Sequence, residues 1–124
     1  MKQVFYALVG AVLLFHVLPA IAWPESCGSQ KIHDFEFGRH SFGDRLLNSV
    51  QVKRSSSFMR VLSFDENIQT KGIISYIQVI DQKRDGNSGC VYLSGGGVGF
   101  YNVILHFKSA RNNGVNFQVN VYGK

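Results

Sequence analysis

Hydrophobic and polar positions alternate most regularly near the C-terminus of the chain. In residues 115–121 every odd position is apolar and every even position is an amide. A period of two predicts a strand with one face in the core and the other in water. Residues 100–109 follow a similar pattern, and we expect Val103, Leu105 and Phe107 to point inward. The Asn-Gly pair at 113–114 is typical of a hairpin turn between the two strands.

Two further strands are predicted just before this hairpin. Residues 73–82 are apolar at both odd and even positions, with Ile73 and Ile77 expected on one face and Ile74 on the other. A strand that is covered on both faces lies in the interior of a sheet. Residues 83–89 form a predicted turn, because Asp85-Gly86 accepts positive φ. Residues 90–94 form a short strand, and the glycine-rich residues 95–99 form a crossover or bulge.

Three strands are predicted in the N-terminal half. Phe35 and Phe37 share one face of residues 31–42, and Val50 and Val52 share one face of residues 46–54. For the start of the second segment, a helical turn capped by Asp44 is the alternative. Residues 58–64 continue the apolar pattern, whereas the polar residues 65–67 are expected to form a loop. Seven strands separated by turns predict an all-β fold, an antiparallel β-sandwich or barrel-like sheet.

Residues 1–22 have the layout of a secretory signal peptide. Lys2 is followed by a near-continuous apolar run over residues 4–18, Pro19 ends the run, and residues 20–22 are small-x-small. We expect cleavage after Ala22 and a secreted, extracellular protein. The alternative is a membrane anchor, but a span needs about 20 apolar residues, and this run is shorter and contains His16. No membrane association is therefore expected after cleavage.

The remaining residues, 23–124, are few enough for a single β-domain. Hydrophobic residues make up 45% and charged residues 17% of the 124-residue chain, which is a globular composition. The formal net charge is +5, but the basic residues are scattered along the chain. A mildly positive field favours anionic surfaces or nucleic acid. A solvated basic surface is the simpler interpretation, so no direct nucleic-acid binding is expected.

Cys27 and Cys90 are the two cysteines of the chain. An even number of cysteines in a secreted chain predicts one disulfide bond, here between Cys27 and Cys90. The bond would join the N-terminal segment to the predicted strands and stabilise the fold by about 4 kcal/mol in the chain-entropy account. Two free thiols are the alternative.

Several short motifs are together similar to one known family. They are Gly43-Asp44-Arg45-Leu46-Leu47, Lys71-Gly72-Ile73-Ile74-Ser75 leading to Ile80-Asp81, Asp85-Gly86, Gly89-Cys90, Gly95-Gly96-Gly97 and the strand from Val103 to Phe107. In this combination the chain resembles the insect multiprotein bridging factor type 2 family. Its members are named transcription activators, and many relatives are described as salivary or secreted peptides. The resemblance covers most of residues 23–124 and implies no catalytic residue.

The resemblance implies two different activities. The activity for which the family is named is bridging a nuclear receptor to the general transcription machinery, through protein contacts and without direct DNA binding. A signal peptide and paired cysteines instead belong to a secreted protein. We therefore expect a secreted, non-enzymatic β-domain that binds an unknown protein partner or ligand in saliva or haemolymph. The transcription coactivator is the alternative.

Candidate chemical groups have simpler structural interpretations. Residues 86–89, Gly-Asn-Ser-Gly, partly match the nucleophile loop of trypsin-like proteases, but asparagine replaces the expected aspartate, and we interpret Ser88 as a turn serine. The glycine run lacks the ending of a phosphate-binding loop. His33, His40 and His106 do not have the spacing of a metal site. We therefore predict no catalytic residues, no metal and no cofactor.

The polar face of the last strand is a possible recognition surface. Asn116, Gln118, Asn120 and Tyr122 lie on the side that the alternation turns toward water. Alanine substitutions there should leave folding intact and weaken the capture of a partner.

Overall fold

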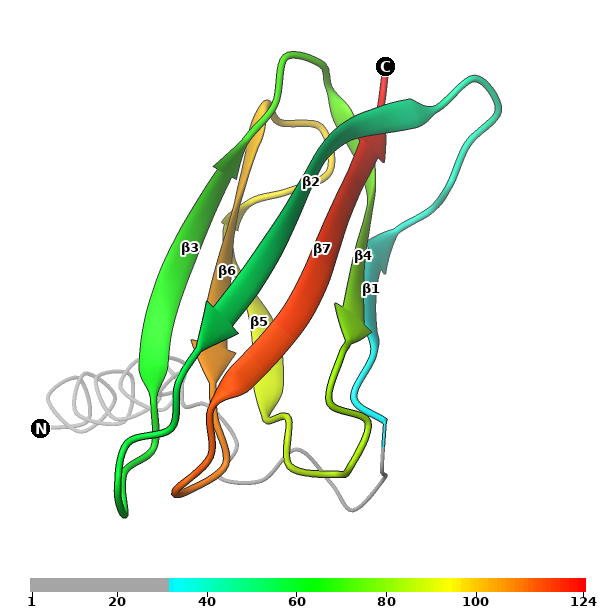
Figure 1. Ribbon diagram of the computed structural model, residues 1–124. Coiled ribbons are helices and arrows are strands. Elements are labelled where there is room, and N and C mark those ends of the chain that lie inside the picture. The colour runs from blue at the N-terminus through cyan, green and yellow to red at the C-terminus, as the bar shows by residue number, and fades with distance from the viewer. Residues whose placement is uncertain (1–31) are drawn as a thin grey trace, which may run out of the picture.

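The computed structural model describes residues 32–124 and shows an all-β antiparallel sandwich (Figure 1). The predicted fold class is confirmed in its sandwich form. Seven strands follow one another along the chain: β1 (Phe35–Gly38), β2 (Arg45–Arg54), β3 (Ser63–Gln69), β4 (Ile74–Asp81), β5 (Cys90–Gly96), β6 (Asn102–Lys108) and β7 (Val115–Gly123). The predicted signal peptide, its cleavage site at Ala22 and Cys27 lie outside the described residues. Signal cleavage and the Cys27–Cys90 disulfide therefore stay predictions.

Two sheets form the layers of the sandwich. The four-stranded sheet has the order β1-β4-β7-β2, and the three-stranded sheet has the order β3-β6-β5. All neighbouring strands pair antiparallel. The hairpin predicted at residues 113–114 is wrong, because β6 and β7 lie in different sheets and the turn between them crosses from one sheet to the other. The strand predicted at residues 73–82 is β4, and its place between β1 and β7 agrees with the interior position expected from its apolar character.

The inner faces of the two sheets form one hydrophobic core. The alternation predicted for the last two strands is confirmed, because the odd positions of β7 from 115 to 121 are buried, and so are Val103, Leu105 and Phe107 of β6. The rings of Phe107 and Phe117, one from each sheet, lie 5.7 Å apart between centroids. Large aromatic side chains in contact across the layers contribute much of the apolar area that folding removes from water.

The strand predicted at residues 58–64 is misplaced. The Arg60 N–H donates to the Ser57 carbonyl at 3.0 Å, and Met59 takes a positive φ of 58°, so this segment turns. β3 begins only at Ser63 and includes residues 65–67, for which the sequence predicts a loop. The physical reason for the wrong prediction is an ion pair made by one of the inward-facing residues of β3. Glu66 points toward the other sheet and is bonded to Arg54 of β2, so a charge stands where the pattern requires an apolar residue.

A bulge changes which side of β4 faces the core. The pairing with β7 shifts between Ile74 and Tyr76, and Ile74 and Ile77 are both buried, at 1% and 0% exposure. Ile73, which the alternation places on the inner face with Ile77, is instead 47% exposed. A bulge adds one residue to a strand and so reverses the alternation beyond it. The hydrophobic pattern alone contains no signal for this reversal.

The loops gather at the two ends of the sandwich. The β1–β2, β3–β4 and β5–β6 loops and Lys124 lie together at one end, uppermost in Figure 1, which we call the upper end. The Ile73 N–H donates to the Lys124 carbonyl at 2.8 Å, which ties two of these segments together. The loops of residues 55–62, 82–89 and 109–114 lie at the opposite, lower end. Within residues 32–124 no helix is long and apolar enough to cross a membrane.

Candidate functional site

The predicted recognition face lies on the outer surface of the four-stranded sheet. β7 pairs with β4 on one side and β2 on the other, and its even-numbered residues point away from the core. The four predicted residues, Asn116, Gln118, Asn120 and Tyr122, are half-buried between side chains of the neighbouring strands. The structure therefore brings all four together on one face, held by strands on both sides.

A chain of hydrogen bonds, which we call the amide ladder, crosses this face from β2 to β4. Gln118 Nε2 donates to Ser49 Oγ at 2.6 Å, and Ser49 Oγ donates to Asn120 Oδ1 at 2.7 Å. Asn120 Nδ2 in turn donates to Gln78 Oε1 at 3.3 Å. Each amide has two N–H donors and an oxygen with two lone pairs, so hydrogen-bonding capacity remains for a partner. Because these groups are uncharged, covering them costs less desolvation than covering ions.

Aromatic rings border the amide ladder toward the upper end. The rings of Tyr76 in β4 and Tyr122 in β7 lie 5.7 Å apart between centroids. His40, from the β1–β2 loop, packs against both, 4.8 Å from Tyr122 and 5.5 Å from Tyr76. Burial, followed by the neighbouring Glu36 carboxylate, raises the pKa of Tyr76. A phenol is protonated at neutral pH even at its ordinary pKa of about 10, so Tyr76 is a hydrogen-bond donor, and the Glu36 carboxylate accepts from it.

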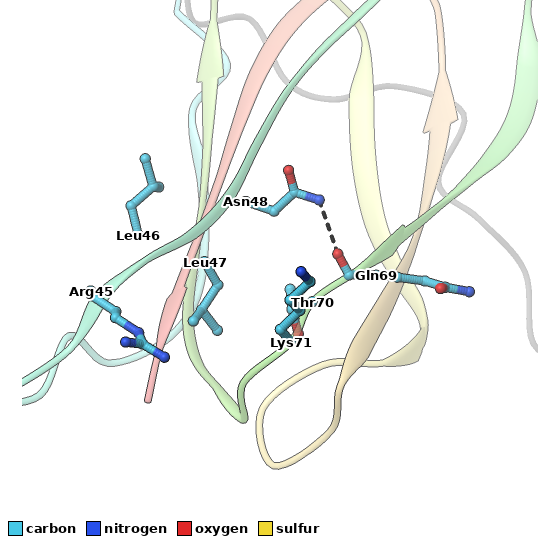
Figure 2. A pocket seen from close by; sticks show the side chains of 7 residues that line it. All are labelled: Arg45, Leu46, Leu47, Asn48, Gln69, Thr70 and Lys71. Carbon is cyan, nitrogen blue, oxygen red and sulfur yellow. Dashed lines mark hydrogen bonds between the residues drawn. The ribbon is translucent and has the colours of Figure 1, made fainter.

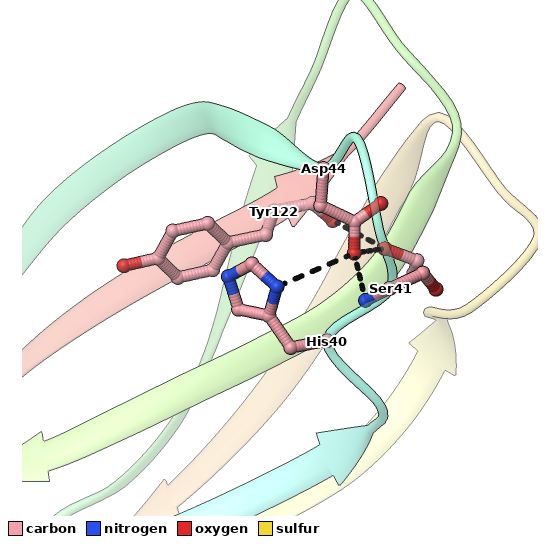
Figure 3. A network of polar contacts seen from close by, with 5 residues as sticks. His40, Ser41, Asp44 and Tyr122 are labelled. Carbon is pink, nitrogen blue, oxygen red and sulfur yellow. Dashed lines mark hydrogen bonds and ion pairs between the residues drawn. The ribbon is translucent and has the colours of Figure 1, made fainter.

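Asp44 holds the loop that carries His40 (Figure 3). Its Oδ2 accepts hydrogen bonds from the Ser41 N–H at 2.6 Å and from Ser75 Oγ at 2.5 Å, and His40 Nδ1 lies 3.8 Å away. The Ser75 hydrogen bond, followed by the Ser41 hydrogen bond, lowers the pKa of Asp44, because both stabilise the carboxylate. This role of Asp44 is not predictable from the sequence. Residues 41–44 have the composition of a turn, but nothing in them indicates the contact with β4.

A cavity of about 670 Å³ lies between the start of β2 and the end of β3. It is lined by residues 45–48 and 69–71 (Figure 2). Asn48 crosses from one sheet to the other, and its Nδ2 donates to the Gln69 carbonyl at 2.9 Å. Arg45 and Lys71 give the lining a positive charge. No local sequence pattern indicates this cavity, because its two walls come from strands that are distant in sequence.

Ser88 lies in a buried hydrogen-bond network at the lower end. Its Oγ donates to Asp81 Oδ1, and both side chains are fully buried. The same carboxylate accepts the His33 N–H at 2.9 Å and the Lys83 N–H at 2.8 Å. The His33 ring is directed to the Gly89 carbonyl, with Nδ1 2.9 Å from that oxygen, and not to Ser88. Ser88 thus fastens the turn that follows β4, in line with its interpretation as a turn serine.

His106 takes part in a second group of serine, histidine and aspartate. Its Nδ1 lies 2.7 Å from Asp65 Oδ1, and its Nε2 lies 2.9 Å from Ser63 Oγ. This is the order of contacts in a hydrolytic triad, but such triads have a buried aspartate and an oxyanion hole. The Asp65 side chain is 57% exposed on the outer surface of the three-stranded sheet. We interpret the group as a polar network that joins β3 to β6.

The three histidines of the sequence analysis lie in different parts of the sandwich. His33 precedes β1, His40 lies in the β1–β2 loop, and His106 is in β6. In the part of the chain that the structure describes, no group of three or more histidine, cysteine, aspartate or glutamate residues is placed to hold a metal ion.

Comparisons with known proteins agree with the resemblance found in the motifs. A family profile described as "Transcription activator MBF2" matches residues 37–123, from β1 to the end of β7. The chain is also similar to a Bombus ignitus protein named "Probable salivary secreted peptide". The two are 28% identical over 125 residues, which cover 97% of this chain and 93% of the relative. No solved structure matches the chain.

Proposed function

The chain belongs to the transcription activator MBF2 family, and from this premise we propose that it is a secreted, non-enzymatic domain that binds a protein or ligand. Two observations support secretion: the name of the Bombus ignitus relative and the signal-peptide layout of residues 1–22. The medium in which it acts is an extracellular fluid such as saliva or haemolymph.

The observation that carries the binding function is the amide ladder with its aromatic border. The ladder residues are fixed by strand pairing and by bonds to one another, so little side-chain entropy is lost when a partner covers them. Tyr76 and Tyr122 add ring surface beside the amides, and tyrosine is enriched at protein interfaces. The face therefore combines free hydrogen-bonding capacity with apolar area, as recognition surfaces do.

The experiment is capture of partners from the native fluid by immobilised protein. Replacing Asn120 and Gln78 together with alanine removes one rung of the ladder, and we expect captured partner to fall about tenfold or more. The matched control replaces Asn67 and Asn102 with alanine, because these two amides form the corresponding bond, at 3.2 Å, on the three-stranded sheet. Equal capture by both folded variants would contradict the proposal.

A second candidate function is that of a transcription coactivator, in line with the family description "Transcription activator MBF2". In this function the chain bridges a nuclear receptor and the general transcription machinery. It requires an unprocessed chain in the nucleus, whereas the first function requires a processed chain outside the cell. The form and location of the protein therefore distinguish the two.

The non-enzymatic part of the proposal has its own test. Ester and peptide substrates are offered to the wild-type protein and to Ser88→Ala, Ser63→Ala and His106→Ala variants. We expect no hydrolysis above the level of buffer, because Ser88 bonds to Asp81 and the Asp65 side chain that contacts His106 is 57% exposed. Hydrolysis that disappears in any of the three variants would show that the domain is an enzyme.

A further inference from the structure

Large apolar side chains are exposed together at the upper end of the sandwich. In the β1–β2 loop Phe42 is 101% exposed, and Leu46 at the start of β2 is 52% exposed. Ile73 of the β3–β4 loop is 47% exposed, and Val98 and Phe100 of the β5–β6 loop are 50% and 55% exposed. Single exposed apolar residues are ordinary, but a cluster contributed by three loops marks an interaction site.

Backbone contacts join these loops into one surface. The Ile74 N–H donates to the Phe100 carbonyl at 3.0 Å, and the Gly99 N–H donates to the Ile74 carbonyl at 2.8 Å. The β5–β6 loop also packs on the end of β1, because a Cβ on Gly38 would lie 2.5 Å from Val98 Cγ2. The three loops that carry the exposed side chains therefore form one connected base at the upper end (Figure 1).

The charge of the upper end is positive. Its exposed basic residues are Arg39, Arg45, Lys71 and Lys124. Among the loop residues 39–45, 70–73 and 97–101, the acidic side chain is Asp44. That carboxylate has no exposed surface and is bonded to Ser41 and Ser75, so the cations dominate the outer surface.

We propose that the upper end docks onto a bilayer that carries anionic phospholipids. Phe42 and Phe100 enter the boundary between headgroups and acyl chains, as the apolar side chains of peripheral proteins do, and the four cations lie over the phosphate and carboxylate headgroups. A bilayer fits better than a protein partner because exposed apolar tips on three separate loops stand beside four exposed cations, which matches acyl chains beneath anionic headgroups. The docking is peripheral. It goes beyond partner binding on the amide ladder, which lies on the face of a sheet and not at this end.

This docking differs from the sequence-based expectation of no membrane contact after cleavage. That expectation rests on the lack of a second continuous apolar run, and apolar tips on separate loops form no such run. Only the fold brings Phe42, Ile73 and Phe100 to the same end of the molecule.

The test is flotation of protein collected from the culture medium with phosphatidylcholine vesicles, with and without phosphatidylserine. We expect binding to the anionic vesicles only, weakened when salt is raised from about 0.1 to 1 M because the screening length falls from about 10 to 3 Å. Arg45→Gln with Lys71→Gln should lower the partition coefficient about fivefold per charge. Phe42→Ala with Phe100→Ala should lower it at least about tenfold.

Matched variants at the lower end serve as controls. Phe58→Ala with Met59→Ala removes two side chains that are 84% and 57% exposed there, and Arg60→Gln with Arg111→Gln removes two charges. Both should float like the wild type.

The proposal is overturned by equal binding to neutral vesicles, by equal losses in the lower-end variants, or by no flotation at all. A dimer that Phe42→Ala disrupts, without vesicle binding, would instead identify a second copy as the occupant. The upper-end variants should still capture protein partners like the wild type. Loss of vesicle binding with unchanged partner capture therefore distinguishes membrane docking from the proposed binding function of the amide ladder.

Discussion

At the scale of single residues, Asp81 shows how one buried charge organises the lower end of the fold. Its carboxylate accepts the Ser88 hydroxyl and the backbone N–H groups of His33, Lys83 and Arg84. Burial opposes ionisation, but these hydrogen bonds outweigh it and lower the pKa of Asp81. One side chain therefore joins the segment before β1 to the turn between β4 and β5.

Replacing Asp81 with asparagine should destabilise the fold. The substitution keeps the shape of the side chain but removes the charge and turns an amide N–H₂ toward hydrogen-bond donors. We expect a loss of about 2–3 kcal/mol in the free energy of unfolding, measured with urea. Asp85→Asn is the control in the same turn, because Asp85 is exposed and accepts one N–H, that of Asn87, at 2.9 Å. Equal losses in the two variants would show that Asp81 has no special role.

The two carboxylates with lowered pKa values, Asp44 and Asp81, predict how stability depends on pH. Their folded pKa lies below the unfolded value of about 3.9, so they stabilise the fold above that pH. This contribution is lost as the pH falls from about 4 through the folded pKa. The melting temperature should therefore decrease on acidification below about pH 4, and it should decrease less in Asp81→Asn. The same decrease in wild type and variant would exclude Asp81 as a cause.

At the scale of elements, β6 is the middle strand of its sheet and supplies the centre of the core. Phe107 has no exposed surface and contacts two rings, Phe64 at 5.4 Å beside it and Phe117 at 5.7 Å in the other sheet. A side chain in this position cannot be shortened without leaving a cavity between the two layers.

Phe107→Ala should lower the free energy of unfolding by about 3–5 kcal/mol, from lost burial and the cavity that remains. Phe58→Ala makes the same chemical change where the ring is 84% exposed and should alter stability by less than about 0.5 kcal/mol. Urea denaturation of both variants measures the difference. A small loss for Phe107→Ala would mean that the two sheets are not packed as described.

Strands with a regular alternation are predictable from the sequence, and strands with a charge in the core are not. The alternation predicts β6 and β7 correctly because each inward-facing residue of these two strands is apolar. β3 was misplaced because Glu66 occupies an inward position with its charge paired to Arg54, a contact between segments that the local pattern does not contain. The local pattern also does not show which residues of β4 point to the core, because the alternation reverses at a bulge that is defined by the pairing with β7.

The candidate site was predictable in part. Asn116, Gln118, Asn120 and Tyr122 share a face because they alternate along one strand, and this is visible in the sequence. Their partners Ser49 and Gln78 come from β2 and β4. Those contacts depend on the register between strands, which alternation within a single strand does not determine.

At the scale of the whole molecule, the sandwich separates different surfaces. The outer face of the four-stranded sheet carries the uncharged amide ladder, whereas the upper end carries exposed apolar and basic side chains. The secreted binding domain acts outside the cell and the transcription coactivator acts in the nucleus, so the location of the protein decides between these two candidate functions.

Intact mass spectrometry of the medium and of nuclear extracts tests this account most directly. We predict a chain in the medium that begins at Trp23, with a mass two hydrogens below that of the reduced form, as expected for a Cys27–Cys90 disulfide. A full-length chain beginning at Met1, found in nuclei and absent from the medium, would contradict it.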